Sequence, residues 1–491
     1  MQNSKNRLSL AFCNFGCYAF FVAIAAALFL LLDQTLLVDK YSGYDISRLV
    51  VTFTLLSCAA VGGYLYEKKK LSTETAVALI FIASFVIKVM YSLKNSYNWY
   101  QHDVESLDTA GHLSYIYRFV TGQGLPDSNE WQFYHPPLHH YISALSVKLS
   151  LSLGFSLDRA FENIQLLTAV YSQICCVLAY KLFKELGAKG ASLVGATALV
   201  AFHPTMIILS GSINNDVLTL MLMMLSVLLL VRWCNNPKWS TTLLLALSTG
   251  LAVMTKFSAV LIAATVGVVV LIYQIVKKRS GWGEFAAKAV AFTGIVFPLG
   301  MWYQIRSAVK FSQPIGYVAP LSTDSALYCG DVSLARRLLP DFTQLDHLFC
   351  HPFGDWNLPI YTLKCSVFGE YDWGNHYLAG LLLALNVVVI VLSGIAAVRL
   401  FLIRDKKFFN AKLVLGITWL LQVAFFVYFN ISSPFGCTMD FRYIVLTMFC
   451  GAGALSMLGV INKRHGICGA LNKASLYACC AFVLVSVLFY M

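Results

Sequence analysis

The sequence predicts an all-α polytopic membrane protein with about 13 transmembrane helices. Hydrophobic residues make up 58% of the 491 residues, and charged residues make up only 12%, about half the share that is usual in a soluble protein. Apolar runs of about 20 residues recur from end to end, and each run is long enough to cross a bilayer. The runs are continuous rather than alternating, which favours helices over the strands of a membrane barrel.

These runs give thirteen candidate spans and a division of the chain into four parts. The spans are 9–32, 48–66, 76–93, 160–183, 190–210, 216–233, 241–256, 258–276, 286–305, 378–402, 411–430, 441–461 and 470–490. The four parts are two N-terminal helices (1–75), a transmembrane core with a polar loop at 94–137 (76–305), a small extracytoplasmic cap (306–377) and the C-terminal helices (378–491). The first run is too long for a signal peptide and lacks a cleavage site, so we expect a retained span.

One further apolar segment, 138–155, is predicted to lie along the membrane interface instead of crossing the bilayer. Its serines and Lys148 are typical of a surface helix. If the N-terminus is cytoplasmic and this segment does not cross, all the basic turns fall inside, as the positive-inside rule requires. These turns are 67–70, 181–189, 232–238, 277–279, 404–407 and 462–464. The C-terminus and the loop 94–137 then lie outside.

The net charge of +12 does not indicate a nucleic-acid partner in a chain of this class. We attribute it to the cytoplasmic loops, with some basic residues left for an anionic ligand. Most of the 14 cysteines lie inside spans, where they behave as small apolar residues. Four lie outside the spans and could form a disulfide among themselves; they are Cys329, Cys350, Cys365 and Cys437.

Ionisable residues gather in the loop 94–137, which contains Asp103, Glu105 and Asp108. Asp103 has the strongest claim to a catalytic role because it closely follows the third span, at the mouth of any cavity between the helices. A carboxylate there can take a proton from an attacking hydroxyl group. Glu105 is the second candidate, and the alternative is that these acids are solvated loop residues.

Basic residues lie on the same predicted face. They are Arg118, Lys256, Arg306, Lys310, Lys364 and Arg442. Lys256 joins two spans with almost no loop, so its ammonium group either snorkels to the interface or contacts a phosphate. Arg442 either contacts a substrate or simply pairs with Asp440.

Histidines in and beside the loop raise the question of a metal ion. With Asp103 or Glu105, residues such as His102, His112 and His139 could complete a divalent-metal site. The alternative is that these histidines hydrogen-bond the backbone or lipid headgroups. Nothing else in the sequence calls for a cofactor.

Five segments form an ordered set of motifs from about 76 to 445. They are QHDVESLDTAGHLSYI (101–116), FYHPPLHHY (133–141), FHPTMIILSGSINNDVL (202–218), TLKCSVFGE (362–370) and MDFRYI (439–444). Together they resemble the multi-spanning glycosyltransferases of the GT-C fold. This group includes the dolichyl-phosphate-mannose protein mannosyltransferases and the bacterial aminoarabinose transferases of lipid A.

The resemblance implies a transferase that moves a sugar from a polyprenyl-phosphate donor to a hydroxyl group of a glycan, lipid or protein, with inversion. Asp103 stands in the place of the general base, and Asp216 in the place of the second acid. His135 stands where some members carry a lysine near the lipid phosphate. This departure shifts the expected phosphate contacts toward Lys256, Arg306 and Arg442, and Arg118 is a further candidate for substrate binding.

We expect a bacterial inner membrane as the location, with the active site on the extracytoplasmic face. The alternatives are a lipid-linked sugar flippase or polymerase and a secondary transporter. Transporters carry ionisable groups near the bilayer midplane, usually within internal repeats. Here Lys88 is the only clearly intramembrane charge and no repeat is visible, so the sequence favours the transferase.

Overall fold

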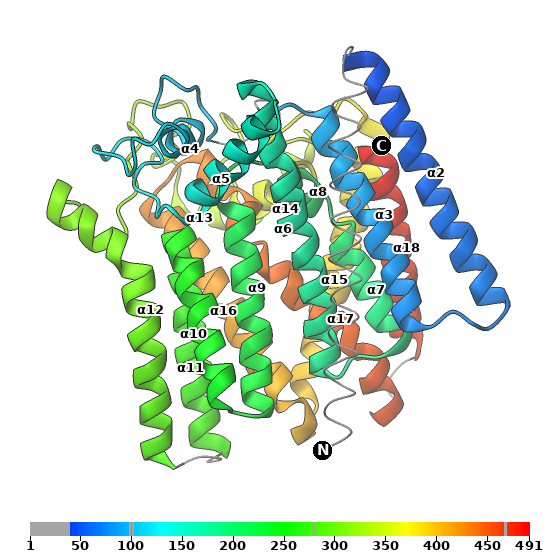
Figure 1. The fold of residues 1–491 in the computed structure, drawn as a ribbon. Coiled ribbons are helices and arrows are strands. Elements are labelled where there is room, and N and C mark those ends of the chain that lie inside the picture. The colour runs from blue at the N-terminus through cyan, green and yellow to red at the C-terminus, as the bar shows by residue number, and fades with distance from the viewer. Residues whose placement is uncertain (1–39, 98–99, 101–102, 278–280, 466–468) are drawn as a thin grey trace.

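The computed structural model describes residues 40–97, 100, 103–277, 281–465 and 469–491 (Figure 1). In this part of the chain, nine helices are long and apolar enough to cross a bilayer, or ten if one bent pair counts as a single span. The described β structure is one isolated bridge between Tyr328 and Phe435. The prediction of an all-α polytopic membrane protein is therefore confirmed. The count of thirteen is not reached, and the predicted span 9–32 lies outside the described residues.

The longer helices follow the predicted spans. They are α2 (Lys40–Glu67), α3 (Thr73–Lys94), α6 (Leu157–Leu186), α9 (Asp216–Asn235), α10 (Trp239–Thr255), α11 (Val260–Lys277), α12 (Trp282–Phe311), α15 (His376–Leu402), α16 (Phe409–Ser432), α17 (Leu446–His465) and α18 (Gly469–Tyr490). The predicted span 190–210 is divided between α7 (Gly190–Ala201) and α8 (Pro204–Ile208), with a bend of 51° at the break before Pro204. Proline lacks the amide hydrogen that would continue the helix.

Two predicted spans become short apolar helices. α10 has 17 residues because its helix ends before Lys256. The span predicted at 441–461 begins only at Leu446, because the residues before it form the 3-10 turns η5 (Gly436–Met439) and η6 (Phe441–Tyr443). α10 thus ends within one residue of its predicted end, whereas α17 begins five residues later than predicted.

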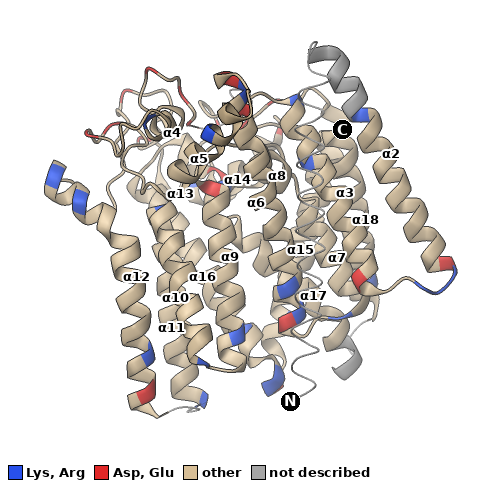
Figure 2. Cartoon of the chain, viewed as in Figure 1, with Lys and Arg blue, Asp and Glu red and all other residues tan. Residues whose placement is uncertain are grey.

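Successive helices run up and down, so the connecting segments lie at two opposite ends of the bundle (Figure 1). At one end the cytoplasmic turns of the predicted threading meet, since Lys184 Nζ lies 3.1 Å from Glu74 Oε1 and Arg232 Nε lies 3.6 Å from Glu185 Oε2. Charged residues concentrate toward the ends of the helices, and the middle of the bundle is mostly uncharged (Figure 2). This segregation is what a bilayer requires of helices that cross it.

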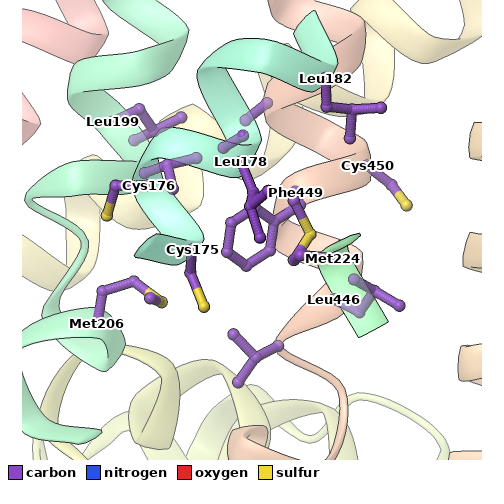
Figure 3. Close-up of a cluster of buried hydrophobic side chains, with 14 of the residues drawn as sticks. Cys175, Cys176, Leu178, Leu182, Leu199, Met206, Met224, Leu446, Phe449 and Cys450 are labelled. Atoms are coloured by element: carbon purple, nitrogen blue, oxygen red, sulfur yellow. The ribbon is translucent and has the colours of Figure 1, made fainter. Parts of the chain in front are cut away.

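The centre of the bundle is built from α6, α7, α9 and α17, whose buried side chains meet around Phe449 (Figure 3). Cys175, Met224 and Cys450 belong to this cluster and fill it as small or flexible apolar groups. α9 is the most buried of the candidate spans, whereas α2 packs on α3 at the edge. Asp216, the first residue of α9, is therefore attached to the most buried of the candidate spans in the described part of the chain.

The segment predicted to lie at the interface forms α5 (Leu138–Ser152), which has 15 residues and is not among the candidate spans. Tyr141, Leu145 and Leu149 follow one another at intervals of four and form an exposed apolar stripe. The opposite face, with His139 and His140, is buried against α4 (His112–Val120) and α6. An apolar stripe on the outside of a short helix agrees with the predicted position at the membrane surface.

The predicted cap is partly integrated into the bundle. α12 extends to Phe311, and α14 (Leu358–Phe368) packs against α8 and α15. The short α13 (Leu334–Leu338) and the turn η3 (Phe342–Leu345) lie between them in the chain. The four cysteines considered for a disulfide are all free thiols in the structure. The cap is instead fixed by a buried ion pair, with Lys364 Nζ 2.8 Å from Asp355 Oδ2.

Replacing Lys364 by methionine should destabilise the protein strongly. Lys364 is fully buried, so the substitution leaves the carboxylate of Asp355 buried without its cation, which costs about 3–5 kcal/mol. We expect a clear decrease of the unfolding temperature of the purified protein in detergent. Lys310→Met is the control, because Lys310 and its partner Asp127 are exposed, and it should change that temperature little. Equal unfolding temperatures for Lys364→Met and the unsubstituted protein would contradict the structural role.

Candidate active site

The guanidinium group of Arg442 lies at the centre of a group of charged side chains from distant parts of the chain. Arg442 Nη1 lies 3.0 Å from Asp103 Oδ2 and 3.5 Å from Asp216 Oδ2, and Arg442 Nε lies 3.2 Å from Asp440 Oδ2. Lys256 Nζ forms an ion pair with Asp216 Oδ1. We call these five residues the Arg442 cluster. Three carboxylates and two cations therefore share one nearly buried site.

Lys256 caps the C-terminus of α10 and does not snorkel to solvent. Its side chain is largely buried and turns toward Asp216. The centre of the Tyr443 ring lies 5.3 Å from Lys256 Nζ and 5.0 Å from Arg442 Cζ, so one aromatic ring contacts both cations. Tyr443 Oη also accepts a hydrogen bond from Arg442 Nη2 at 3.1 Å. We did not predict this residue, although its position beside Arg442 in MDFRYI was a usable signal.

Asp216 is the first residue of α9, which places its carboxylate at the positive end of the helix dipole. Its amide donates to Asn214 Oδ1 at 3.1 Å. The neighbouring Asn215 Nδ2 donates to Thr255 O at 3.2 Å and so ties the start of α9 to the end of α10. This connection sets Asp216 opposite Lys256.

Asp440 fixes the position of Arg442. Its Oδ1 accepts the backbone amide of Arg442 at 2.9 Å and the thiol of Cys365 at 2.8 Å. Cys365 lies on α14, and Thr362 of the same helix donates to Met439 O at 2.9 Å. The pairing of Arg442 with Asp440 is thus present, and it accompanies the contacts with the other two acids.

Asp103 enters the cluster from a loop with an unusual backbone. Asp103 has φ = 59° and Glu105 has φ = 58°, in the left-handed region that non-glycine residues adopt infrequently. The first amides of α4 hold the loop, since His112 N donates to Asp103 O at 3.2 Å. Gly111 is required there, because an added Cβ would lie 2.4 Å from Glu105 Cβ. The side chain of Glu105 is exposed and lies outside the Arg442 cluster.

A row of histidines borders the site. His112 Nδ1 and His140 Nε2 are 2.8 Å apart and share one hydrogen bond. The rings of His112 and His135 are nearly parallel, at 6°, with centroids 5.7 Å apart. His140 stacks on Tyr115 at 4.0 Å. α4, α5 and the segment between them are joined through these rings.

These imidazoles are held in the neutral form. Burial lowers the pKa of His112 and of His135, and the positive charges of Lys256 and Arg442 lower both pKa values further. Burial also lowers the pKa of His139 to about 4, and its Nε2 donates to Ile213 O at 2.8 Å. At neutral pH, the ring of His135 is therefore neutral and offers an N–H donor without a positive charge.

Two of the predicted substrate-binding arginines lie outside the Arg442 cluster. Arg118 Nη2 donates to Leu125 O at 3.4 Å, and Arg306 Nη2 donates to Pro126 O at 2.8 Å. Both arginines thus hold the loop that connects α4 to the segment before α5. Their contact with a substrate stays a prediction.

The described residues contain no group of three or more His, Cys, Asp or Glu side chains that could hold a metal ion. His112 and His139 each use one ring nitrogen within the protein, toward His140 and Ile213 O. His102 lies outside the described residues. The suggested metal ligands therefore stay a prediction, and the chemistry that the structure offers is that of carboxylates and fixed cations.

The Arg442 cluster combines two chemical capacities. Asp103 is partly exposed and can accept a proton. Lys256 and Arg442 are fixed, desolvated cations that can stabilise negative charge on an oxygen. A carboxylate that can accept a proton, beside two cations that can bind an anion, supplies the groups needed to transfer a substituent from a phosphate to a hydroxyl group.

Comparison with known proteins agrees with this chemistry. The family model of the dolichyl-phosphate-mannose-protein mannosyltransferases matches residues 134–332, a segment that includes His135, Asp216 and Lys256. The match covers 134–332 of the 491 residues, and it supports the predicted class, a membrane glycosyltransferase of the GT-C type. Within this class, the matched segment is similar to the protein mannosyltransferases. No curated protein sequence matches the chain.

Several solved structures are similar to the chain. The protein O-mannosyltransferase Pmt1–Pmt2 complex of S. cerevisiae, bound to the sugar donor, has a TM-score of 0.38 and 14% identity over 53% of this chain and 36% of that chain. The Archaeoglobus fulgidus oligosaccharyltransferase AglB, with an inhibitory peptide and a dolichol-phosphate, has a TM-score of 0.48 and 14% identity over 84% and 55%. The apo form of the oligosaccharyltransferase from that organism has a TM-score of 0.49 and 11% identity over 84% and 55%. The chain spans about half the length of these proteins or less.

The buried neutral histidines predict a loss of stability in mild acid. Their folded-state pKa values lie below the ordinary value of about 6.5, so the unfolded chain takes up protons first as the pH falls through that value. The unfolding temperature should therefore fall between pH 7 and pH 5. For His139 this contribution continues down to its folded pKa of about 4.

The control is His139→Asn, which keeps an N–H donor and removes the titrating ring. The decrease in unfolding temperature from pH 7 to pH 5 should be smaller in this variant than in the unsubstituted protein. An identical decrease in the two proteins would show that His139 does not titrate as its burial requires.

Proposed function

We propose that the chain transfers a sugar from a polyprenyl-phosphate donor to a hydroxyl group at the extracytoplasmic boundary of the membrane, with inversion at the anomeric carbon. The observation that carries this proposal is the Arg442 cluster, in which a partly exposed carboxylate lies beside two desolvated cations. The description of the matched family, dolichyl-phosphate-mannose-protein mannosyltransferase, supports a lipid-phosphate sugar as donor.

The reaction is a single displacement. The acceptor oxygen forms a bond to the anomeric carbon while the bond from that carbon to the phosphate oxygen breaks. Asp103 takes the proton of the hydroxyl group, and Lys256 and Arg442 stabilise the negative charge that develops on the departing lipid phosphate. Attack from the side opposite the leaving phosphate inverts the sugar. Both substrates are held at one boundary, so positioning supplies a large part of the rate.

The remaining polar residues support this arrangement. Asp216 and Asp440 orient the two cations, and Tyr443 covers both of them. His135 offers a neutral N–H donor to the phosphate or to a sugar hydroxyl. Arg118 and Arg306 keep the loop above the site in place. The acceptor is a hydroxyl group of a glycan, a lipid or a protein.

We assign the site to the extracytoplasmic side on the distribution of basic turns, and we keep a bacterial inner membrane as the proposed location. Asp216 of the Arg442 cluster begins α9, whereas Arg232 lies in the last turn of the same helix, at the other end of the bundle. The positive-inside rule assigns such turns to the cytoplasm. A donor anchored in the outer leaflet would then reach the cluster from between the helices.

Asp103→Asn should abolish most of the transfer. The amide cannot take the proton, so the rate should fall by about 10²–10⁴-fold. The assay follows transfer from radiolabelled polyprenyl-phosphate sugars in membranes that contain equal amounts of each protein.

The matched control is Asp108→Asn, which removes one acid from the same loop. Asp108 is exposed and lies outside the Arg442 cluster, so its variant should keep the rate of the unsubstituted protein. Equal transfer by Asp103→Asn and the unsubstituted protein would exclude Asp103 as the base.

Cysteine labelling tests the side of the membrane. Gln123 is exposed after α4, and Asn236 is exposed after the last turn of α9. α4 and the C-terminal end of α9 lie at opposite ends of the bundle (Figure 1). In intact cells, a membrane-impermeant maleimide should label Gln123→Cys above the background of the unsubstituted protein and should label Asn236→Cys only after the cells are opened. The reverse pattern would place the site in the cytoplasm and would exclude the proposed sidedness.

A further inference from the structure

The proposed base and the proposed donor phosphate need the same partner. Asp103 Oδ2 lies 3.0 Å from Arg442 Nη1, and the side chain of Arg442 is only 5% exposed. In the unliganded protein, the proposed base and the proposed phosphate-binding group therefore contact each other.

Of the three acids that contact Arg442, Asp103 is the one that can be exchanged. Its side chain is 25% exposed, whereas those of Asp216 and Asp440 are 8% and 5% exposed. Asp216 is also held by Lys256, and Asp440 by the amide of Arg442 and the thiol of Cys365. An anion that approaches Arg442 from the accessible side meets Asp103 first.

The loop that carries Asp103 is suited to a second position. Asp103 and Glu105 both have left-handed backbone conformations, and such residues persist only when their surroundings hold them. One side-chain contact and the amides of α4 hold Asp103 in place. Asp216 and Asp440, in contrast, lie at the start of a helix and within a 3-10 turn.

We propose that Asp103 occupies the place of the donor phosphate on Arg442 in the unliganded protein, and that the phosphate releases it to act as the base. This inference rests on the proposed function and specifies how the site is regulated. A phosphodiester carries one negative charge, as Asp103 does, so the exchange leaves the charge around Arg442 unchanged. The lipid phosphate thus binds before Asp103 is free to take the proton of a hydroxyl group.

Binding of farnesyl phosphate tests the exchange without any transfer. The full chain is purified in detergent, and the Kd for farnesyl phosphate is measured for the unsubstituted protein and for Asp103→Asn. Removing the competing carboxylate should lower the Kd by about fivefold, because this factor corresponds to the free energy of a partly exposed ion pair. Asp108→Asn, with the same change of charge in the same loop, should bind as the unsubstituted protein does. Asp103→Ser replaces Asp103→Asn if the latter does not fold, and it should also bind more tightly.

The outcomes separate this inference from the proposed function. An unchanged or larger Kd for Asp103→Asn, together with loss of transfer, would overturn the exchange and leave the transferase mechanism in place. Equal tightening by Asp103→Asn and Asp108→Asn would also overturn it, because the effect would then be one of general charge. Failure of every variant to bind farnesyl phosphate would overturn both the exchange and the proposed donor site.

Discussion

The buried positive charge of Arg442 is the constraint on which the rest of the site depends. A guanidinium group taken out of water must be surrounded by acceptors, or the fold loses several kcal/mol. The acceptors here come from the loop before α4, from the start of α9 and from the turn η6. One charge thus brings together segments that the membrane helices alone would leave independent. The same charge is what a leaving phosphate would require.

The histidine row is a consequence of this concentration of charge. His112 and His135 lie where burial and two cations oppose a further positive charge, so their rings stay neutral, and the ring of His112 stacks on that of His135 and hydrogen-bonds that of His140. They form a polar wall without adding to the charge of the site. The wall also links α4 to α5, whose outer face carries the apolar stripe. Asp103 is thus connected to the apolar stripe of α5 through the contact of its carbonyl with His112 and the contact of His112 with His140.

Much of the site could be predicted from residue types and topology, and part of it could not. Asp103, Lys256 and Arg442 were identified because each lies near the end of a span on the same predicted face, and Asp216 was identified through the family resemblance; the structure brings all four together. Arg118 and Arg306 were predicted on the same face, yet they bind backbone carbonyls of a loop. Proximity to a span end does not show in which direction a long, flexible side chain points. Tyr443 and Cys365 were missed because their roles depend on neighbours from other helices.

The sequence by itself determined that the chain crosses a bilayer many times, where most of the helices lie and which connections share an end. Hydrophobic runs and basic turns are local properties, and the cost of exposing polar groups to lipid makes them decisive. Only the tertiary structure decided which charges meet. Asp103 and Arg442 are 339 residues apart in the chain, and their contact depends on how the helices are arranged around one another. That arrangement arises from the packing of side chains between helices, which has no signature in the local pattern of any one segment.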